Sequence, residues 1–485
     1  GRSYAPDTSW MHADDSYDRD LAAFETHYFH TDGNAAVRLP AGMAKVTVWR
    51  GVEHEIETRS VNIQAERREI LRIELEPLDL PGTWRSWQSG DVHVHMNYGG
   101  TYRNTPERLV QQAAAEDLDV VFNLVVNKEQ RVPDIAYFSA APDAASTDEV
   151  LLAHSQEYHT SYWGHMGLLG LNDHYLIPGY VAYPATGTAS LYPDNAAIAD
   201  LAHAQNAAVG YVHPFGAPPP NPETDASLTN ALPVDVALGK IDYYEVVGFS
   251  DHRASAEVWY RLLNCGFRIA AAAGTDAMAN YASLRGPVGV NRTYVHSVDG
   301  AADPAARGDA WLAGLKAGHT MATNGPLLGL TVDGHEPGAE IELGAGEHEL
   351  AYSGFMRSIV PVDHLELVYN GEVIETIEHE QRTSADLHGS LPVRESGWLV
   401  LRAWNDGSHP MVFDLYPFAT TSPVYITIDG KQPRSTEDAD YFIAWIERIR
   451  ESAAPHEDYN SDAERAAVLA HLDRAVRIFE GRRAD

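Results

Sequence analysis

Cysteine is almost absent from this sequence, with Cys265 the single example among 485 residues. One thiol can form neither an intrachain disulfide nor a cysteine metal cluster, so any bound metal must be held by nitrogen and oxygen ligands. We expect Cys265 to be a small buried residue, because it follows the apolar end of a predicted helix.

Basic residues are also scarce, since 35 Lys and Arg face 69 Asp and Glu and give a formal net charge of -34. Such a charge repels phosphate backbones and anionic membrane surfaces, so nucleic acid is not an expected partner. We interpret the acidic excess itself as an adaptation to solubility or salt. The expected partner is a small-molecule substrate, and the sequence leaves a homo-oligomer open.

No apolar run in the sequence approaches the ~20 residues that a membrane-spanning helix needs, so we expect no membrane insertion. The chain begins with Gly1 rather than Met, which we interpret as a processed or trimmed start. A signal peptide removed in that way would place the protein in the periplasm or outside the cell, and a cytoplasmic location stays open as the alternative.

The length predicts about two to four domains. Short alternating segments, including strands at 43–49 and 70–75, predict a β-sandwich-like module, and the Asn370-Gly371 turn predicts a hairpin in a second one. Helices starting at Ser435 and Ser461 end the chain. The predicted parts are an N-terminal β-sandwich-like module (1–83), a strand-and-helix core (84–328), a C-terminal β-sandwich-like module (329–430) and C-terminal helices (431–485).

The core alternates between strands and helices, which indicates an α/β fold with a parallel sheet or barrel. Thr105 and Pro106 predict the start of a helix over 108–118, followed by an apolar strand at 118–126. In such a fold, functional side chains gather at the carboxyl ends of the strands. The other predicted core elements are helices at 194–206 and 254–264 and strands at 208–212, 241–247 and 269–273.

The stretch Asp91-Val92-His93-Val94-His95 has the strongest chemical signal. Alternate side chains of a strand point to the same face, so His93 and His95 can grip one metal ion. The alternative is a solvated strand face that carries two polar residues. A His-x-His pair alone does not decide between the two, so the choice depends on further ligands.

Four more residues with suitable side chains fall at or near the ends of predicted strands, namely Glu157, His165, His213 and Asp276. Each alone has a simpler interpretation, such as a loop histidine or the N-cap of a helix. Their concurrence instead favours a metal centre with the nitrogen and oxygen ligands that suit zinc, manganese or iron. Among the other histidines, we keep His252 as a substrate or supporting residue and expect structural or exposed roles for His154, His159, His174 and His319.

Several of these motifs together resemble the polymerase-and-histidinol-phosphatase (PHP) superfamily: Asp91–His95, the Glu157 element, Gly164-His165, His213-Pro214 and Gly274-Thr275-Asp276. Longer stretches at 97–106, 284–292 and 322–327 are similar to its carbaryl-hydrolase-like CehA/McbA family. The resemblance covers about residues 90–330 and implies a distorted seven-stranded β/α barrel around a metal cluster, flanked here by the β-sandwich-like modules and the C-terminal helical pair. The N-terminal module is also similar to a carboxypeptidase-regulatory-like sandwich.

The resemblance implies two divalent metal ions, with zinc favoured and manganese or iron as alternatives. One ion would be held by His93, His95, Glu157 and Asp276, and the second by Glu157, His165 and His213, with Glu157 bridging. The third site that the superfamily often has is not expected, because Lys128 and Met278 stand where its histidines would be.

The implied activity is hydrolysis of an ester or carbamate bond in a small molecule by a hydroxide that the two metals activate. Asp276 would carry a proton to the leaving group. Lys128, Tyr98, Arg103 and Arg285 are candidates for binding substrate or stabilising the oxyanion, although each could equally be a solvated loop residue. Two alternatives stay open: a metal-dependent phosphoesterase for a small phosphate ester, and a catalytically inactive protein that binds polysaccharide.

Overall fold

The computed structural model describes residues 3–6, 28–98, 103–126, 134–176, 181–280, 286–297, 303–378 and 382–484. Its helices are η1 (Gly82–Ser86), α1 (Pro106–Ala115), α2 (Asn195–His203), α3 (Leu232–Ala237), α4 (His252–Asn264), α5 (Pro304–Ala317), α6 (Thr436–Ala453) and α7 (Asp462–Glu480). The strands before residue 300 are β1 (Gly42–Val48), β2 (Glu57–Ile63), β3 (Trp87–His95), β4 (Val120–Val126), β5 (Leu151–Tyr158), β6 (Met166–Leu169), β7 (Ala208–Tyr211), β8 (Tyr243–Val247), β9 (Ala270–Ala273), β10 (Ala277–Met278) and β11 (Arg292–His296). The later strands are β12 (Thr320–Thr323), β13 (Leu327–Val332), β14 (Glu340–Leu343), β15 (His348–Arg357), β16 (His364–Tyr369), β17 (Glu372–Thr376), β18 (Ser384–Val393), β19 (Gly397–Trp404), β20 (Phe418–Thr421) and β21 (Val424–Ile428).

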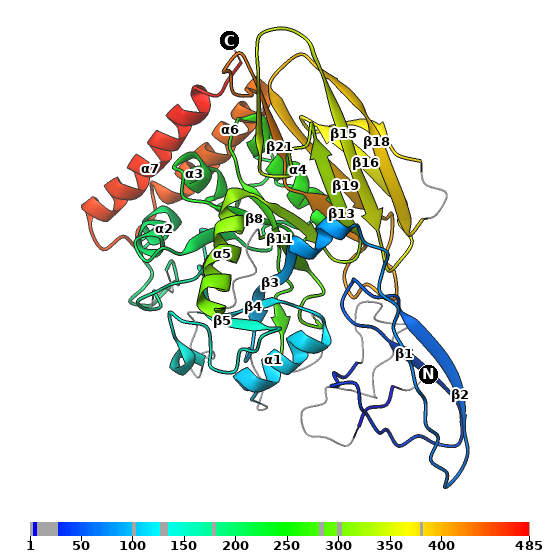
Figure 1. The fold of residues 1–485 in the computed structure, drawn as a ribbon. Coiled ribbons are helices and arrows are strands. Elements are labelled where there is room, and N and C mark those ends of the chain that lie inside the picture. The colour runs from blue at the N-terminus through cyan, green and yellow to red at the C-terminus, as the bar shows by residue number, and fades with distance from the viewer. Residues whose placement is uncertain are drawn as a thin grey trace.

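A mixed sheet of 16 strands runs through the molecule in the order β14-β21-β19-β20-β12-β11-β3-β4-β5-β6-β7-β8-β9, with β10, β16 and β17 paired beside this path (Figure 1). Strands β3, β4 and β5 are parallel neighbours, and so are β7, β8 and β9. Strand β6 lies antiparallel to both β5 and β7, so the two groups run in the same direction. The carboxyl ends of all six parallel strands therefore meet at one edge of the sheet.

The predicted seven-stranded barrel is not confirmed. Among the described residues, β9 forms a backbone ladder with β8 alone and reaches β11 and β12 through side-chain bonds. The amide of Ala273 donates to the hydroxyl of Thr293 at 2.7 Å, and the hydroxyl of Thr320 donates to the carbonyl of Ala271 at 2.7 Å. Since β9 consists of four alanines, it can approach these strands closely, and the sheet curls back toward its own start without a continuous ladder.

The described N-terminal residues form one protruding two-stranded ladder, β1 with β2, in place of the expected sandwich (Figure 1). The strand predicted at 43–49 is confirmed as β1. The strand predicted at 70–75 is wrong, because the segment that pairs with β1 is Glu57–Ile63. Ile70 and Leu71 are exposed, so their alternation with polar residues has no buried face behind it.

The C-terminal strands divide between two sheets. Strands β13, β15 and β18 form a separate antiparallel sheet, and the others extend the central sheet. One hydrophobic cluster contains residues of both, including Leu330, Leu350 and Leu401, so the sheets pack on a shared core. The hairpin predicted at Asn370-Gly371 is confirmed between β16 and β17, and both turn residues have positive φ, at 51° and 89°.

The helix boundaries follow the capping residues that the sequence contains. The Thr105 side chain accepts from the amide of Arg108 at the start of α1, where Pro106 is the first helical residue. Ser435 and Ser461 cap α6 and α7 in the same way, as predicted. These two helices bury one apolar face against the core next to α3 and α4. None of the described helices is both long and apolar enough to cross a membrane.

Candidate metal centre

His93 and His95 lie at the carboxyl end of β3, buried to 0% and 1% exposure, with their Nε2 atoms 3.2 Å apart. The Nδ1 atom of His93 lies 3.1 Å from Oε1 of Glu245, and Nδ1 of His95 donates to the carbonyl of Leu124 at 2.8 Å. Because each Nδ1 faces an acceptor, we assign the ring proton to Nδ1 and the lone pair to Nε2. Two lone pairs that face each other at this distance fit a shared cation.

Two carboxylates complete this first group of donors. The Oδ1 atom of Asp276 lies 3.0 Å from Nε2 of His95 and 3.6 Å from Nε2 of His93. The Oε2 atom of Glu157 lies 3.4 Å and 3.8 Å from the same two nitrogens. Three of these residues, His93, His95 and Asp276, offer donor atoms that all lie within 4.8 Å of one another, which is close enough for one ion to contact all three.

Glu157, near the end of β5, also faces a second group of histidines. Its Oε1 atom lies 2.9 Å from Nδ1 of His165 and 3.2 Å from Nε2 of His213. Burial raises the pKa of Glu157, but the hydrogen bonds of His165 and His213 outweigh burial and hold that pKa well below its usual value. An ionised carboxylate whose two oxygens face different histidine pairs is suited to bridge two cations.

The carboxylates of this cluster favour a positive charge at His93. Burial lowers the pKa of His93, but the neighbouring carboxylates of Glu245 and Glu157 more than offset burial and raise that pKa to about 10. The protein therefore favours a positive charge at this point, which a proton or a metal cation can supply. Either a proton or a metal cation agrees with the arrangement of the donor atoms, but only a metal cation would contact all of the atoms that converge here.

Two of the six predicted ligands have a backbone conformation that residues other than glycine rarely adopt, with φ of 32° at His213 and 56° at Asp276. Hydrogen bonds hold both in place. The amide of His213 donates to Oε2 of Glu245 at 2.7 Å, and the amide of Asp276 donates to the carbonyl of His93 at 2.7 Å. Such strain persists only where the surroundings enforce it, and it clusters at functional sites.

Asp91 ties the end of β3 to the loop that carries Asp276. Its Oδ1 atom accepts from the amides of His93 and Thr275, both at 3.0 Å. Its Oδ2 atom accepts from the hydroxyl of Thr275 at 2.5 Å and from the amide of Gly289 at 2.7 Å. Burial raises the pKa of Asp91 to about 6 although these bonds lower it. Asp91 thus positions two candidate ligands, His93 directly and Asp276 through the preceding Thr275.

Glu245 was missed by the sequence analysis, which treated 241–247 only as a strand. The carboxylate has no exposed surface and contacts both His93 and His213 through different oxygens. The available signal was a single carboxylate in the middle of the buried strand Tyr243–Val247. A buried charge requires partners, so such a residue points to a cluster of polar groups nearby.

His159 was set aside as structural or exposed, but it lies beside the predicted second group. Donor atoms of Glu157, His159 and His165 all lie within 4.8 Å of one another. The ring centroids of His159 and His165 are 3.3 Å apart. The signal that could have found it is the spacing Glu157-x-His159 at a strand end, which repeats that of His93 and His95.

The remaining predicted site residues have different placements. The ring of Tyr98 lies 5.3 Å from that of His95, so it borders the cluster, whereas Arg103 is exposed. Met278 lies on β10 and pairs with His95 across the ladder to β3. Lys128 and Arg285 lie outside the described residues.

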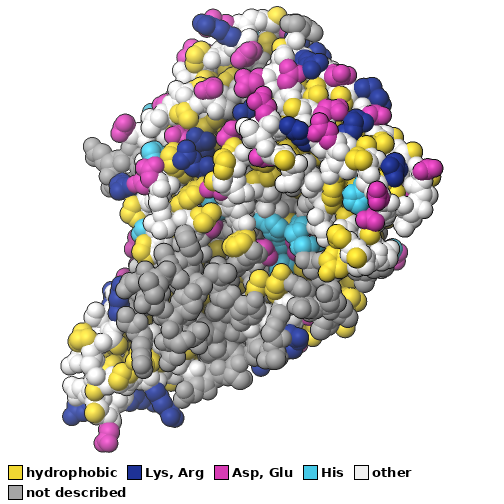
Figure 2. Space-filling view, turned by 180° about the vertical axis from the view of Figure 1, so that it is seen from behind, with side chains coloured by type: hydrophobic (Ala, Val, Ile, Leu, Met, Phe, Trp, Pro, Cys, Tyr) yellow, Lys and Arg dark blue, Asp and Glu magenta, His cyan; other side chains and the backbone are white. Residues whose placement is uncertain are grey.

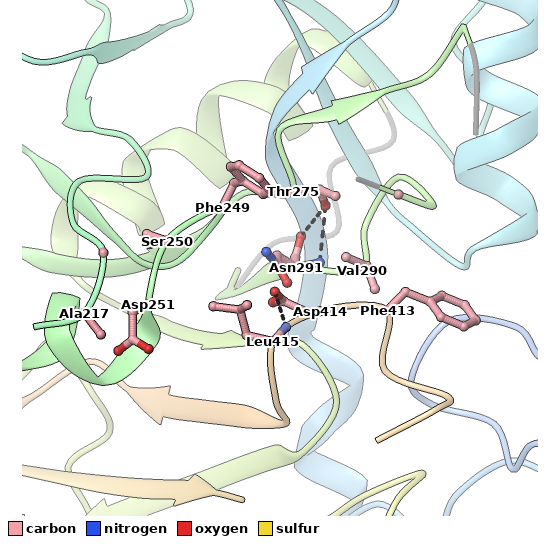
Figure 3. Close-up of a pocket in the computed structure, with 12 residues that line it drawn as sticks. Ala217, Phe249, Ser250, Asp251, Thr275, Val290, Asn291, Phe413, Asp414 and Leu415 are labelled. Atoms are coloured by element: carbon pink, nitrogen blue, oxygen red, sulfur yellow. Dashed lines mark hydrogen bonds between the residues drawn. The ribbon is translucent and has the colours of Figure 1, made fainter. Parts of the chain in front are cut away.

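A cavity of about 310 Å³ lies beside the loop that carries Asp276, since Thr275 is one of the residues that line it (Figure 3). Its walls include Phe249, Thr275, Asn291 and Leu415, and Thr275 directly precedes Asp276. His252 does not line this cavity. It has no exposed surface, and its Nε2 atom lies 2.8 Å from Asp414, a residue of the cavity wall.

Solvent reaches the candidate metal centre from one side. The side chains of His165 and His213 are 22% and 18% exposed, whereas His93 and His95 are buried. On the face opposite to that of Figure 1, histidine side chains gather in a hollow (Figure 2). The second group of histidines is therefore the side from which a small molecule can approach.

Comparison with models of protein families finds no match for this chain, and comparison with curated proteins finds none either. Among solved structures, the chain is similar to a two-domain protein from Bacteroides vulgatus that contains a predicted PHP-like metal-dependent phosphoesterase. The two are 14% identical with a TM-score of 0.33, and the match covers 75% of this chain and 100% of the other.

Proposed function

We propose that this protein is a metal-dependent hydrolase of the PHP superfamily and its carbaryl-hydrolase-like family, which cleaves an ester or carbamate bond of a small molecule. The observation that supports it most is the convergence of His93 Nε2 and His95 Nε2, 3.2 Å apart, on Glu157 and Asp276 in a buried cluster. Divalent cations bound there would acidify a water molecule and polarise the scissile carbonyl.

In this proposal the chain divides its donors between two cations. His93, His95 and Asp276 would hold the first, and Glu157, whose two oxygens face His95 and His165, would be shared. His165 and His213 contribute to the second, and His159 is placed to join them. The nitrogen and oxygen donor set favours zinc, with manganese and iron as alternatives.

Asp276 is the residue we assign to proton transfer. Its Oδ1 atom faces His95, and its Oδ2 atom lies 3.7 Å from Nε2 of His213. A carboxylate that touches both donor groups can take a proton released between them and pass it to the leaving group. Tyr98 beside His95 is a candidate for orienting the substrate.

The cavity beside the cluster supports a carbonyl substrate over a phosphate ester. Its described lining contains the carboxylates of Asp251 and Asp414 and neither lysine nor arginine. A phosphate ester would bring further negative charge to these walls, whereas an uncharged ester or carbamate would not. Phosphoester hydrolysis thus remains the alternative that the experiment must exclude.

The test combines metal analysis with a substrate panel. Protein purified without chelators should contain close to two divalent ions per chain and should cleave 4-nitrophenyl acetate or a 4-nitrophenyl carbamate faster than 4-nitrophenyl phosphate. The double variant His93→Ala/His95→Ala should lose metal and turnover together. His174→Ala is the matched control, because His174 is 62% exposed and outside the cluster. Full activity in metal-free protein would contradict the proposal, and near-zero metal content would favour an inactive binding protein.

A further inference from the structure

We propose that Tyr243 is a positioning residue of the candidate metal centre, whose hydroxyl donates a hydrogen bond through one buried water molecule to the carboxylate of Glu157. This inference rests on the proposed hydrolase function, in which Glu157 is shared by two cations. It adds to that function a residue that lies beneath the candidate ligands and orients the shared carboxylate.

Tyr243 lies on the face of β8 that is turned to the metal cluster. Residues two apart on a strand point the same way, so Tyr243 shares a face with Glu245. Glu245 reaches this cluster, since its Oε1 atom lies 3.1 Å from Nδ1 of His93. Tyr243 precedes Glu245 along the strand and has no exposed surface. Its side chain therefore lies one step deeper than the candidate ligands.

Two glycines make room for the ring of Tyr243. Gly210 pairs with Tyr243 between β7 and β8, Gly167 pairs with Gly210 between β6 and β7, and Glu157 pairs with Gly167 between β5 and β6. A Cβ atom added at Gly210 would overlap the ring of Tyr243, and one added at Gly167 would overlap its hydroxyl oxygen. The ring thus crosses β7 and brings its hydroxyl to β6, along a row that ends at Glu157.

The hydroxyl of Tyr243 takes the place that a side chain at Gly167 would have. Residues opposite each other in an antiparallel ladder direct their side chains to the same face, as Gly167 and Glu157 do here. Their Cβ positions are about 4.5–5.5 Å apart, so the hydroxyl lies roughly 5 Å from Cβ of Glu157. One water molecule can span the remaining gap to the carboxylate.

The chemistry of the surroundings explains why a hydroxyl stands here. It is buried and forms no hydrogen bond with the other residues that the structure describes. The ring packs in an apolar cluster that includes Val92 and Ala272, where phenylalanine would avoid the cost of a buried hydroxyl without a partner. Burial raises the pKa of Tyr243 well above its usual value, and the carboxylates of Glu245 and Glu157 raise it further. The hydroxyl therefore keeps its proton, and because it points away from β8, Glu157 is the acceptor it approaches.

Tyr243→Phe tests the inference by removing the hydroxyl and keeping the ring. Competition with a chromophoric chelator should show a zinc affinity about tenfold below that of the wild type, as for other groups that orient metal ligands. The visible spectrum of the cobalt-substituted protein should shift as the geometry at Glu157 changes. Tyr175→Phe is the matched control and should change neither, since its hydroxyl is also buried without a partner among the described residues and lies outside the cluster. An unchanged zinc affinity in Tyr243→Phe would overturn the inference.

A pair of double variants separates the hydroxyl from packing. Without the oxygen of Tyr243, a Cβ atom at Gly167 would lie 3.4 Å from Cζ of the ring and 3.1 Å from Cγ1 of Val212, which must give by a few tenths of an ångström. Tyr243→Phe/Gly167→Ser therefore returns a hydroxyl beside Glu157, whereas Tyr243→Phe/Gly167→Ala returns only a methyl group. The serine variant should recover most of the lost zinc affinity, and the alanine variant should not. Equal affinities in the two would assign the effect to packing and overturn the inference.

The readout is metal binding and not turnover, so the inference and the proposed function fail separately. A wild type that binds two zinc ions and cleaves none of the 4-nitrophenyl esters contradicts the proposed function, while the chelator competition still decides the role of Tyr243. A wild type that binds no zinc would overturn both.

Discussion

Glu245 and His93 form a buried pair across 152 residues of sequence, with Oε1 of Glu245 lying 3.1 Å from Nδ1 of His93. The other oxygen of Glu245 accepts from the amide of His213. One carboxylate therefore fixes the tautomer of a candidate ligand from β3 and the strained backbone of a candidate ligand that follows β7. Such supporting carboxylates increase the basicity and hold the orientation of metal-binding histidines.

Glu245→Gln should weaken metal binding about 10- to 100-fold, because an amide cannot accept from His93 and from the amide of His213 at once. Competition for zinc with a chromophoric chelator measures the change. Glu372→Gln is the matched control, since Glu372 is exposed on β17. Wild-type zinc affinity in Glu245→Gln would show that the pair has no supporting role.

His159→Ala should weaken the second ion and leave the first. The side chain lies close to Glu157 and His165, whereas the donor group of His93, His95 and Asp276 does not include it. Zinc titration followed by calorimetry should resolve two binding events in the wild type and weaken one of them by about tenfold in the variant. If both zinc-binding events are unchanged in the variant, His159 does not contribute to the site. If both are lost, His159 is needed for folding and not for the second ion alone.

Gly274→Ala should disturb the metal centre through packing alone. A Cβ atom there would lie 2.5 Å from Oε1 of Glu245 and 2.5 Å from Cβ of His93. Relief of this overlap would cost about 1–3 kcal/mol and would displace the pair that holds the cluster. The midpoint of thermal unfolding and the zinc affinity should both fall. Gly344→Ala, where the added Cβ meets no atom within 4 Å, should change neither.

Local signals in the sequence predicted which candidate ligands converge better than they predicted the residues that support them. Strand alternation predicts that His93 and His95 share a face, and strand ends predict where Glu157 and Asp276 lie, because both follow from neighbouring residues. The structure brings all of these residues together. Glu245 was missed because its partners are distant in sequence and become visible only when β8 lies beside β7.

The part of the fold that the sequence did not predict is the pairing of strands. The helices that begin at Thr105, Ser435 and Ser461 were predicted correctly because a cap acts within one turn. Residues 70–75 alternate as a strand does, but β1 pairs with a nearer segment and leaves them unpaired. The core and the C-terminal strands share one sheet because β12 pairs with β20. Neither segment has a local sequence signal that predicts this pairing.

The bond between His471 of α7 and Asp194 makes the docking of the last helix depend on pH. Its Nδ1 and Oδ2 atoms are 2.7 Å apart, and Asp194 also caps α2. The hydrogen bond to Asp194 raises the pKa of His471, and partial burial opposes this rise less strongly. Because the folded pKa lies above the unfolded value near 6.5, the stabilisation is fully present below about pH 6.5 and is lost as the pH rises through the folded value.

The difference in unfolding temperature between the wild type and His471→Gln should thus be largest near about pH 5.5 and should shrink toward zero near about pH 9. His388→Gln, at an exposed position on β18, should show no such trend. A difference that is constant with pH would show that His471 contributes by packing and not by charge.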